Sequence, residues 1–474
     1  MTLKLNPRTG PHIRDRRRLY EQEARRDRRE AIDVGAVPRT PRNDLLPVCP
    51  KETRQVADLT PADRKVRKLT EAQVARVTGS IQKLGFVTPI LIDAHGKIID
   101  GHTRVEVAKR LGLSEIPCLI VDHLSATELK ALKIAINRTA ETGVWDLPAL
   151  EIDLGELIVD GFEVELTGFS APEIDCVLPA EVEEAATALH SVAVSRPGDL
   201  WTLGPHKVLC GSALERSCFA ALMGDDVARL VLTDEPYNVP IAGHVTSGEH
   251  REFAMAAGEM TLDQFGDFNL TWMTLCIAYL MQGGVLGTFI DWRSVDLVIR
   301  TGKLLDLELL NLIVWEKTNA GMGSLWRSQH EMLPMFKKGG APHINNIELG
   351  KHGRNRSNVW TYPGANSLGS SAQEMLADHP TPKPVPMLQD ALLDITERGD
   401  IVLDPFLGSG SMLIAAEATG RRCRGIELDP LYVDLAVRRW EAHTGENAFL
   451  EHDGASFGET AEARSDAAST AEVR

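Results

Sequence analysis

Two short segments of the chain carry residue types that could do chemistry. The first is Thr233-Asp-Glu-Pro-Tyr-Asn238, where a carboxylate and an aromatic ring lie three residues apart, directly after the apolar run Leu230-Val-Leu232. The second is Asp404-Pro-Phe-Leu-Gly-Ser-Gly410, which follows another apolar run and leads into a helical pattern. Glycines at such a turn permit positive φ and let the backbone approach a ligand closely. The two segments predict a site that combines an acid, an aromatic ring and a glycine loop.

A second acid lies where α/β nucleotide folds hold a ribose. Glu427 follows Gly410 by 17 residues and ends the next predicted strand, and a carboxylate near that spacing hydrogen-bonds ribose hydroxyls. No lysine follows the glycines, so a P-loop NTPase is not favoured. The glycine turn by itself would fit any strand-to-helix corner. Together with Asp404, Phe406 and Glu427 it favours a cofactor that contains a nucleoside.

These segments resemble motifs of the β group of amino-methylating DNA methyltransferases, in which the catalytic tetrad precedes the cofactor loop. The loop at 404–410 is similar to the S-adenosylmethionine loop of that family, so Phe406 would flank the cofactor's adenine and Glu427 would hold its ribose. His379-Pro-Thr-Pro-Lys-Pro384 resembles the family segment that helps to close the cofactor pocket. The resemblance implies one set of cofactor-binding residues: Asp404, Phe406, Gly408, Gly410, Glu427, Thr381 and Lys383.

The segment Asp234-Glu-Pro-Tyr237 resembles the family's catalytic Asp-Pro-Pro-Tyr, which implies catalytic roles for Asp234, Glu235, Pro236 and Tyr237. An exocyclic amine is a poor nucleophile because its lone pair is delocalised into the ring. The Asp234 carboxylate and the Glu235 carbonyl would accept its hydrogens, and Tyr237 would stack on a base flipped from the duplex. Aspartate at the first position favours N6 of adenine, with N4 of cytosine as the alternative.

Glu235 departs from the family's proline. The backbone carbonyl survives the change, but the turn loses rigidity, and we expect an extra carboxylate near the flipped base or a phosphate. A catalytically weakened, DNA-binding ParB-like regulator is therefore a competing interpretation of the whole chain.

Target recognition is expected between the two motifs, at residues 324–378, where basic residues outnumber acids. Arginine pairs with guanine, asparagine pairs with adenine, and either can hold phosphates. The segment predicts double-stranded DNA as partner, with contacts from Arg327, Arg354, Arg356 and Asn358. The alternative is a solvated basic loop with Trp360 packed in the core.

Near the front of the chain, Ile98-Ile-Asp-Gly-His-Thr-Arg104 resembles the phosphate-binding signature of the ParB/sulfiredoxin fold. Gly101, His102 and Arg104 occupy the pattern at a predicted helix start, where backbone amides favour anions. Sulfiredoxins have cysteine at the place of His102, and ParB proteins that switch with CTP carry more arginine here. A nucleotide site and an inherited DNA-docking or assembly module remain equal alternatives for this domain. A homodimer of the chain is a further partner hypothesis.

The elements around these motifs predict an α/β protein: a Rossmann-like S-adenosylmethionine-dependent methyltransferase domain preceded by a small ParB-like α/β domain. Strand-like runs alternate with helical patterns, which implies a largely parallel sheet with ligands at the carboxyl ends of its strands. The predicted organisation is a basic arm at 1–50, a ParB-like domain at 51–140, an acidic connecting segment at 141–195, the methyltransferase domain at 196–453 and a disordered tail at 454–474.

The bulk composition is consistent with this organisation. The chain of 474 residues has a net charge of −16, but thirteen acids and no Lys or Arg lie between Ala140 and Ser195, so the total does not exclude a local DNA cleft. The seven cysteines form no CxxC pair, which favours reduced thiols and neither disulfides nor a metal site. Glycines interrupt the most apolar window, 270–290. We therefore expect no membrane span and a cytoplasmic location.

Overall fold

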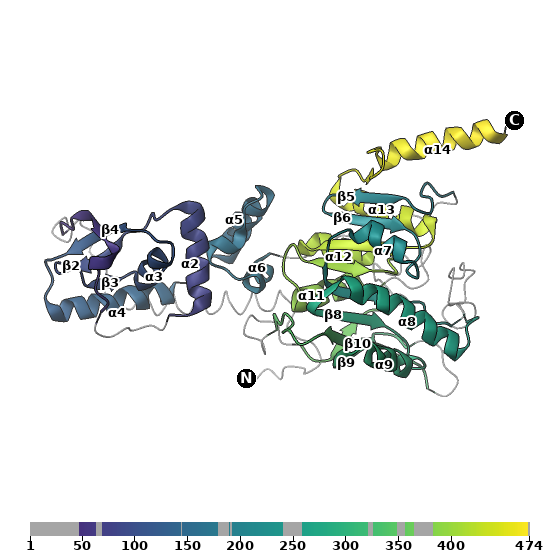
Figure 1. Cartoon of the computed structure of the whole chain (residues 1–474), viewed down its shortest axis with the longest axis horizontal. Helices are drawn as coiled ribbons and strands as arrows, with labels where there is room; N and C mark the ends of the chain where they lie inside the picture. Colours follow the sequence, from purple (N-terminus) through teal and green to yellow (C-terminus); the bar gives the residue numbers. More distant parts are fainter. Residues whose placement is uncertain are drawn as a thin grey trace, which may run out of the picture. The chain divides into compact units, whose positions relative to one another are not determined.

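The structure is a computed structural model that divides into two compact units, Met1–Ser170 and Ala171–Arg474, which are described separately (Figure 1). The described residues are 47–62, 69–143, 145–178, 189, 192–239, 258–320, 326–347, 356–364 and 383–472. Nearly all of the predicted basic arm lies outside them. Within them, no helix is long and apolar enough to cross a membrane, and no three His, Cys, Asp or Glu side chains gather in a way that could hold a metal.

The first unit contains a four-stranded mixed sheet in the order β1-β4-β2-β3. Its elements are β1 (Lys51–Gln55), α2 (Glu71–Leu84), β2 (Ile90–Asp93), β3 (Ile98–Asp100), α3 (His102–Arg110), β4 (Glu115–Val121) and α4 (Ala126–Thr142). Two helices of this unit begin at capping residues. The Thr70 hydroxyl accepts from the Gln73 amide at 3.2 Å, and Ser125 and Glu128 form a capping box, which satisfies backbone donors that the helix leaves unpaired.

The described part of the acidic segment predicted at 141–195 is folded. It forms α5 (Leu147–Val159), a 3₁₀ turn at Val164–Thr167 and α6 (Ala171–Val177). Leu150 and Leu154, one helical turn apart, are buried while the intervening acids face solvent, as an amphipathic helix requires. The Arg76 guanidinium also donates to the Gly168 carbonyl at 3.1 Å. The charge count reported a solvated face rather than a lack of structure.

The second unit is built on a ten-stranded sheet in the order β11-β9-β10-β8-β7-β12-β13-β6-β5-β14. Its strands are β5 (Leu200–Leu203), β6 (His206–Cys210), β7 (Ala228–Asp234), β8 (Leu280–Phe289), β9 (Leu307–Lys317), β10 (His330–Lys338), β11 (Val359–Tyr362), β12 (Ile401–Asp404), β13 (Arg422–Glu427) and β14 (Phe449–Leu450). The central strands β8, β7, β12, β13 and β6 are parallel, which confirms the predicted fold class and places all of their carboxyl ends at one edge.

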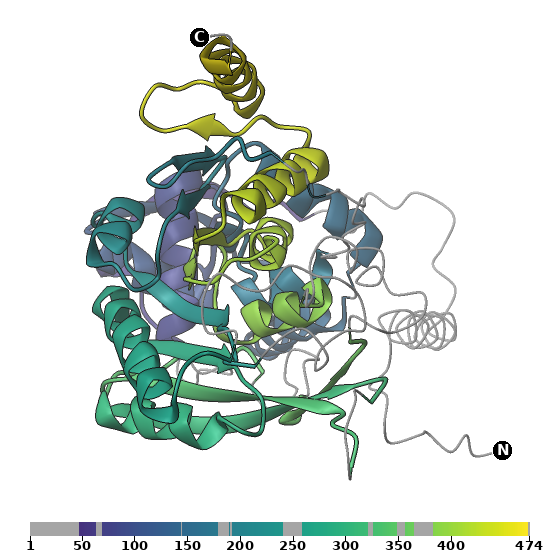
Figure 2. The same ribbon diagram turned by 90° about the vertical axis from the view of Figure 1, so that its right-hand side faces the viewer.

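Helices cover both faces of this sheet (Figure 2). They are α7 (Arg216–Met223), α8 (Leu262–Tyr279), α9 (Val295–Leu304), α11 (Val385–Ile395), α12 (Ser411–Thr419) and α13 (Pro430–Thr444). Alternation along a strand separates the two cores. Leu230 and Leu232 of β7 pack with α11, α12 and α13, whereas Val231 packs with α7, α8 and α9. Helices therefore bury both faces of the central parallel strands, as a parallel sheet requires.

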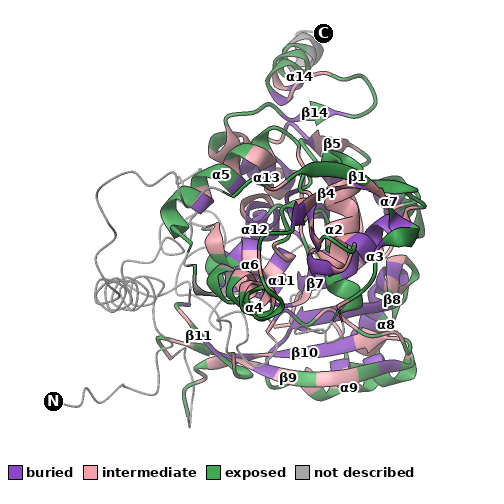
Figure 3. Cartoon of the chain, turned by 90° about the vertical axis from the view of Figure 1, so that its left-hand side faces the viewer, coloured by how far each residue is buried: buried purple, intermediate pink, exposed green. Residues whose placement is uncertain are grey.

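Two sequence-based boundaries differ from the structure. The recognition region predicted at 324–378 contains β10 and β11, which are strands of the central sheet. The tail predicted to be disordered forms α14 (Phe457–Glu472), whose residues are mostly exposed (Figure 3). Phe457 anchors this helix, since it is buried and its ring lies 5.2 Å from that of Trp201. Arg464 adds an ion pair with Asp199. A small, polar composition concealed a helix that one aromatic residue fixes to the core.

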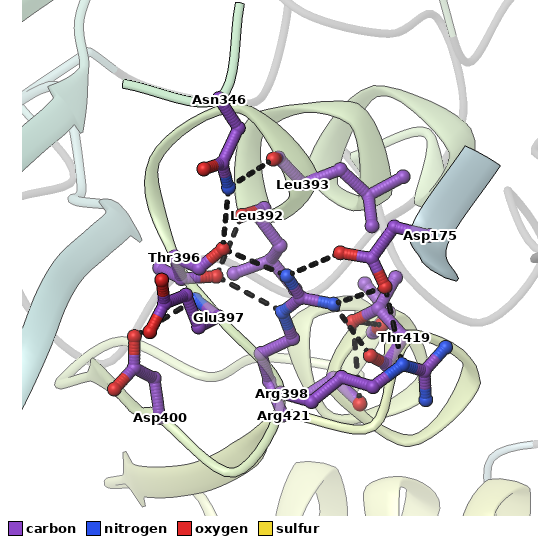
Figure 4. Close-up of polar contacts among 12 residues, drawn as sticks. Asp175, Asn346, Leu392, Leu393, Thr396, Glu397, Arg398, Asp400, Thr419 and Arg421 are labelled. Carbon is purple, nitrogen blue, oxygen red and sulfur yellow. Dashed lines mark hydrogen bonds and ion pairs between the residues drawn. The ribbon is translucent and has the colours of Figure 1, made fainter. Parts of the chain in front are cut away.

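A buried ion pair attaches α6 to the rest of the second unit (Figure 4). The Asp175 carboxylate pairs with Arg421 at 2.9 Å, and both side chains are at most 1% exposed. Arg421 also donates to the Thr396 carbonyl at 2.8 Å, and Arg398 pairs with Asp175 at 3.2 Å. Because hydrogen bonds surround both charges, the pair fixes the helix that leads into the sheet.

Candidate active site

The two sequence motifs meet at the carboxyl edge of the central strands. β7 ends at Asp234 and lies between β8 and β12, with Asp234 opposite Phe289 of β8. The Thr233 hydroxyl donates to the Asp404 carboxylate at 2.5 Å. This bond joins the strand of the tetrad directly to the strand of the glycine loop, although 170 residues separate them in sequence.

Three charged side chains from distant parts of the chain converge at the tetrad. The Lys383 ammonium donates to Asp234 Oδ2 at 2.6 Å and pairs with Glu331 at 3.2 Å. The Tyr237 hydroxyl lies 2.9 Å from Asp234 Oδ1 and 2.7 Å from Glu331 Oε2. That hydroxyl has one proton and can donate to only one carboxylate at a time. Lys317 completes the cluster through an ion pair with Glu331.

Aromatic rings enclose the Lys383 ammonium. It lies 5.5 Å from the Tyr237 ring centroid, 5.2 Å from that of Phe289 and 5.5 Å from that of Trp315. These distances fall within the range of cation–π attraction. Ring faces and carboxylates therefore surround the Lys383 ammonium, and such surroundings stabilise positive charge.

Burial and charge pairing oppose each other in this cluster. Burial raises the pKa of Asp234, and the Lys383 ammonium works against that rise. Burial would also raise the pKa of Glu331, but Lys317 and Lys383 outweigh it and hold that pKa at about 2. Burial disfavours charge on Lys383, yet Asp234 and Glu331 keep its pKa above the usual value. Two ammonium groups thus balance two carboxylates.

Glu235 does not place a carboxylate near the base pocket, so that expectation is wrong. Its side chain is 1% exposed and lies in the core, where Oε2 accepts from the Trp272 indole at 3.1 Å. Oε1 has no hydrogen-bond partner. Burial raises the pKa of Glu235 well above its ordinary value and so favours the neutral form of this acid. The residue contributes its backbone to the tetrad turn and its side chain to the core.

The glycine loop takes the conformation that its residues indicate. Gly408 and Gly410 have φ of +55° and +85°, and the Gly408 amide donates to Glu427 Oε2 at 2.8 Å. The Asp429 amide donates to the other Glu427 oxygen at 2.8 Å, while burial raises the pKa of Glu427 to about 7. A side chain on Gly410 would lie 2.8 Å from Ala436, so this glycine also permits α12 to pack on α13.

Phe406 lies beside this loop as a half-buried ring. Its neighbours are Phe268, with ring centroids 5.8 Å apart, and Trp272, which meets it edge-on at 5.6 Å. The Phe406 amide donates to Asp404 Oδ1 at 3.2 Å, and burial raises the pKa of Asp404 to about 7. An aromatic face, a ribose-type carboxylate and a positive-φ glycine turn are thus brought together, a set of groups that fits a nucleoside.

Two of the predicted DNA contacts have structural roles instead. Arg356 pairs with Asp390 at 2.6 Å and with Asp394 at 2.8 Å, and its guanidinium lies 5.0 Å from the centroid of the Trp360 ring. Asn358 donates to the Leu312 carbonyl at 3.2 Å. These side chains fasten β11 and α11, which local sequence could not show because the acids lie more than thirty residues away.

The structure describes two of the other four predicted contact and pocket residues. Arg327 is exposed in the β9–β10 connection, where it also bonds the Ala320 carbonyl. Lys383 reaches the tetrad rather than the glycine loop. Arg354 and Thr381 lie outside the described residues.

The residues of the ParB-type signature make contacts within the first unit. Gly101 has φ +97° and begins α3. The Arg104 guanidinium donates to the Thr88 carbonyl at 2.8 Å and pairs with Asp100 at 2.9 Å, and His102 Nε2 accepts from the Ala62 amide at 3.4 Å. This arrangement fixes the loop before β2 and leaves the nucleotide prediction without support from Arg104.

Three residues of the site escaped the sequence analysis. Glu331 and Lys317 stand at facing ends of β10 and β9, and only strand pairing brings them together. Asn238 has φ +55°. Its side-chain amide donates to the Met260 carbonyl at 2.8 Å and its side-chain oxygen accepts from the Met260 amide at 3.1 Å. An asparagine directly after the tetrad was the available signal, since asparagine tolerates left-handed turns.

Comparison with known proteins decides the family. The DNA methylase family matches residues 228–438, a range that includes the tetrad, the glycine loop and the pocket between them. The second unit therefore contains a domain that matches the DNA methylase family. Residues 52–137 match the ParB N-terminal domain, and residues 148–197 match the ParB-methyltransferase HTH domain. The last match covers the segment that the sequence analysis took for a connector.

Two curated relatives are type II methyltransferases. M2.DpnII of Streptococcus pneumoniae is 29% identical over 246 residues, which cover 48% of this chain and 88% of the relative. M2.LlaDCHI of Lactococcus lactis subsp. cremoris is 29% identical over 227 residues, which cover 44% and 81%. Both matches are consistent with the domain assignment.

Solved structures of DNA-modifying enzymes also resemble the chain. TTHA0409 of Thermus thermophilus, described as a putative DNA modification methylase complexed with S-adenosyl-L-methionine, is 23% identical, covers 53% of this chain and 96% of its own, and has a TM-score of 0.37. PvuII DNA methyltransferase, which is cytosine-N4-specific, is 16% identical, covers 55% and 92%, and has a TM-score of 0.41.

Proposed function

We propose that this DNA methyltransferase transfers a methyl group from S-adenosylmethionine to the N6 amine of adenine in double-stranded DNA. The observation that carries the proposal is the hydrogen bond from Thr233 to Asp404, because it fixes an amine-accepting carboxylate beside a nucleoside-binding loop. The aspartate at the first tetrad position is what favours adenine over cytosine.

The tetrad would act by accepting hydrogen bonds from the amine. The Asp234 carboxylate and the Glu235 carbonyl would take one amine hydrogen each, which draws the lone pair out of conjugation. Tyr237 would stack on the flipped base. The pairing of Lys383 with Asp234 at 2.6 Å opposes the rise in pKa that burial causes and so favours the ionised carboxylate. Fixed charges and correct orientation supply most of the rate in such a displacement.

The cofactor would be held by the residues around the glycine loop. S-adenosylmethionine supplies the methyl group when it is bound. Glu427 would accept from the ribose hydroxyls, Phe406 would lie against the adenine, and the Gly408–Gly410 turn would allow close approach. The amides that already hold Glu427 orient its carboxylate toward this turn. After transfer the amine sheds a proton, for which Asp234 is the nearest acceptor.

Methylation of cytosine at N4 remains the second candidate, because the same acceptors serve either amine. The deciding experiment is transfer of tritiated methyl from S-adenosylmethionine to unmethylated duplex DNA, followed by nucleoside analysis, with Asp234→Ala as control. Label in N6-methyladenine that the control loses is the expected result. Label in N4-methylcytosine would overturn the choice of base, and cofactor binding without transfer would favour the weakened regulator.

A further inference from the structure

The second unit has seven tryptophans, all among the described residues, and they fall into two groups by exposure. Five are less than a tenth exposed: Trp201, Trp272, Trp315, Trp360 and Trp440. The other two, Trp292 and Trp326, are 53% and 84% exposed. A buried indole contributes a large apolar area to a core, so an exposed one calls for an explanation. Each of these two is followed directly by an arginine, Arg293 or Arg327.

Both pairs lie at the edge of the sheet that carries the tetrad. β8 is parallel to β7 and ends at Phe289, opposite Asp234, so Trp292 follows the end of β8 at that edge. β9 and β10 form an antiparallel pair, and Met332 near the start of β10 bridges to Ile290. The connection between β9 and β10, which contains Trp326, therefore emerges at the same edge. No exposed tryptophan of this unit lies elsewhere among the described residues.

The chemistry of these pairs fits a duplex with a displaced base. An aromatic ring stacks on bases irrespective of sequence, and a neighbouring guanidinium can hold phosphate. Arg293 lies 5.0 Å from the centroid of the Trp292 ring and pairs with Asp291, so this ring is backed by its own neighbours. An enzyme that flips a base must offset the lost stacking, and apolar side chains inserted between bases are a known way to do so.

We propose that Trp326 stacks in the position that the flipped base vacates, and that Trp292 contacts the flanking base pair. The inference rests on the proposed function, since it assigns the surface that receives DNA at the same site. Trp326 is the more exposed ring and carries no aromatic contact of its own among the described residues. Its function is to hold the duplex open while the base occupies the tetrad pocket.

The test uses the full chain and a duplex whose methylated sequence has been identified by sequencing DNA modified by the wild type. 2-Aminopurine replaces the target base, where its fluorescence rises when the base leaves the stack of the duplex. Trp326→Ala and Trp326→Phe are compared with Leu304→Ala, an equally accessible apolar residue (77% exposed) just before the start of β9, at the opposite edge. The KM values for DNA and for S-adenosylmethionine are measured for each.

For Trp326→Ala we expect the KM for DNA to rise about 5- to 100-fold, the range expected when stacking on one base is lost. The KM for the cofactor should not change, and the fluorescence rise should be lost. Phenylalanine should restore most of both, and Leu304→Ala should behave as wild type. An active wild type with an unchanged KM for DNA in Trp326→Ala overturns the inference. A wild type that transfers no methyl refutes the proposed function instead. The stacking role is then decided by the affinity for a duplex that contains one abasic site. Trp326→Ala should weaken this affinity, and Leu304→Ala should not.

Discussion

Lys383 is the residue whose removal tests the electrostatics of the site most directly. Its ammonium lies 2.6 Å from the Asp234 carboxylate and 3.2 Å from that of Glu331. Two unit charges about 4 Å apart interact by about 4 kcal/mol at an effective dielectric constant of about 20. This interaction is shared between two carboxylates, and its part at Asp234 lowers the pKa of that carboxyl group against the rise that burial causes.

Methionine at position 383 removes the charge and keeps an apolar chain among the rings. Burial already raises the pKa of Asp234, and loss of the cation raises it further. The groups that face Asp234 are then Glu331, Tyr237, Glu235 and Asp404, none of which carries positive charge. Because the ionised Asp234 is the stronger hydrogen-bond acceptor, the acidic limb of the rate profile should move to higher pH.

The assay is the single-turnover methylation rate as a function of pH, with wild type, Lys383→Met and Lys383→Arg. Lysine 337 provides a matched control, since it pairs with Glu308 at 2.7 Å on the same sheet and far from the tetrad in the β10 register. We expect Lys383→Met to lose most activity at low pH and to recover part of it at high pH. A uniform loss at all pH values would refute the electrostatic role and favour closure of the cofactor pocket.

Three further predictions address residues whose roles the structure revises. Glu235→Gln should leave the methylation rate and its pH dependence nearly unchanged, because burial raises the pKa of this acid and favours the neutral form that glutamine imitates. A large loss of rate would show that its proton matters. Asp175→Ala should lower the free energy of unfolding by about 3–5 kcal/mol, because it leaves a buried arginine charge unpaired. Chemical denaturation measures this free energy. A loss below about 1 kcal/mol, as at a surface ion pair, would contradict the prediction. Arg356→Gln should lower thermal stability but not the salt dependence of DNA binding, whereas Arg327→Gln should reduce that slope by about 1.

Local patterns predicted the parts of the fold that depend on neighbouring residues. The strands β7, β12 and β13, the caps at Thr70 and Ser125 and the glycine loop all follow from short-range signals, and the structure confirms them. The sequence could not show which distant strands pair. The residues of β10 and β11 were therefore assigned to a target recognition region, although they form strands of the central sheet.

The same limit explains the misassigned charges. Arg356 looked like a DNA contact because its immediate neighbours are polar, but its partners Asp390 and Asp394 lie on α11. Asp175 was one of thirteen acids in an apparent connector, yet it is buried against Arg421. A charged residue is solvated or paired according to what the fold brings to it, and that information is not local. Glu331 is the clearest case, since strand pairing alone gives it a role.

The alternation of side chains along β7 accounts for the tolerance of glutamate in the tetrad. Asp234 lies at the end of the strand with its carboxylate toward Lys383, and the next residue turns to the other side, toward Trp272 of α8. The family's proline would occupy that second position with an apolar ring. Glu235 occupies it with an acid whose pKa burial raises, which favours the neutral form. The carbonyl that accepts the amine belongs to the backbone and survives either side chain. The substitution thus alters the core beneath the site and leaves its acceptors in place, which favours an active enzyme over a weakened regulator.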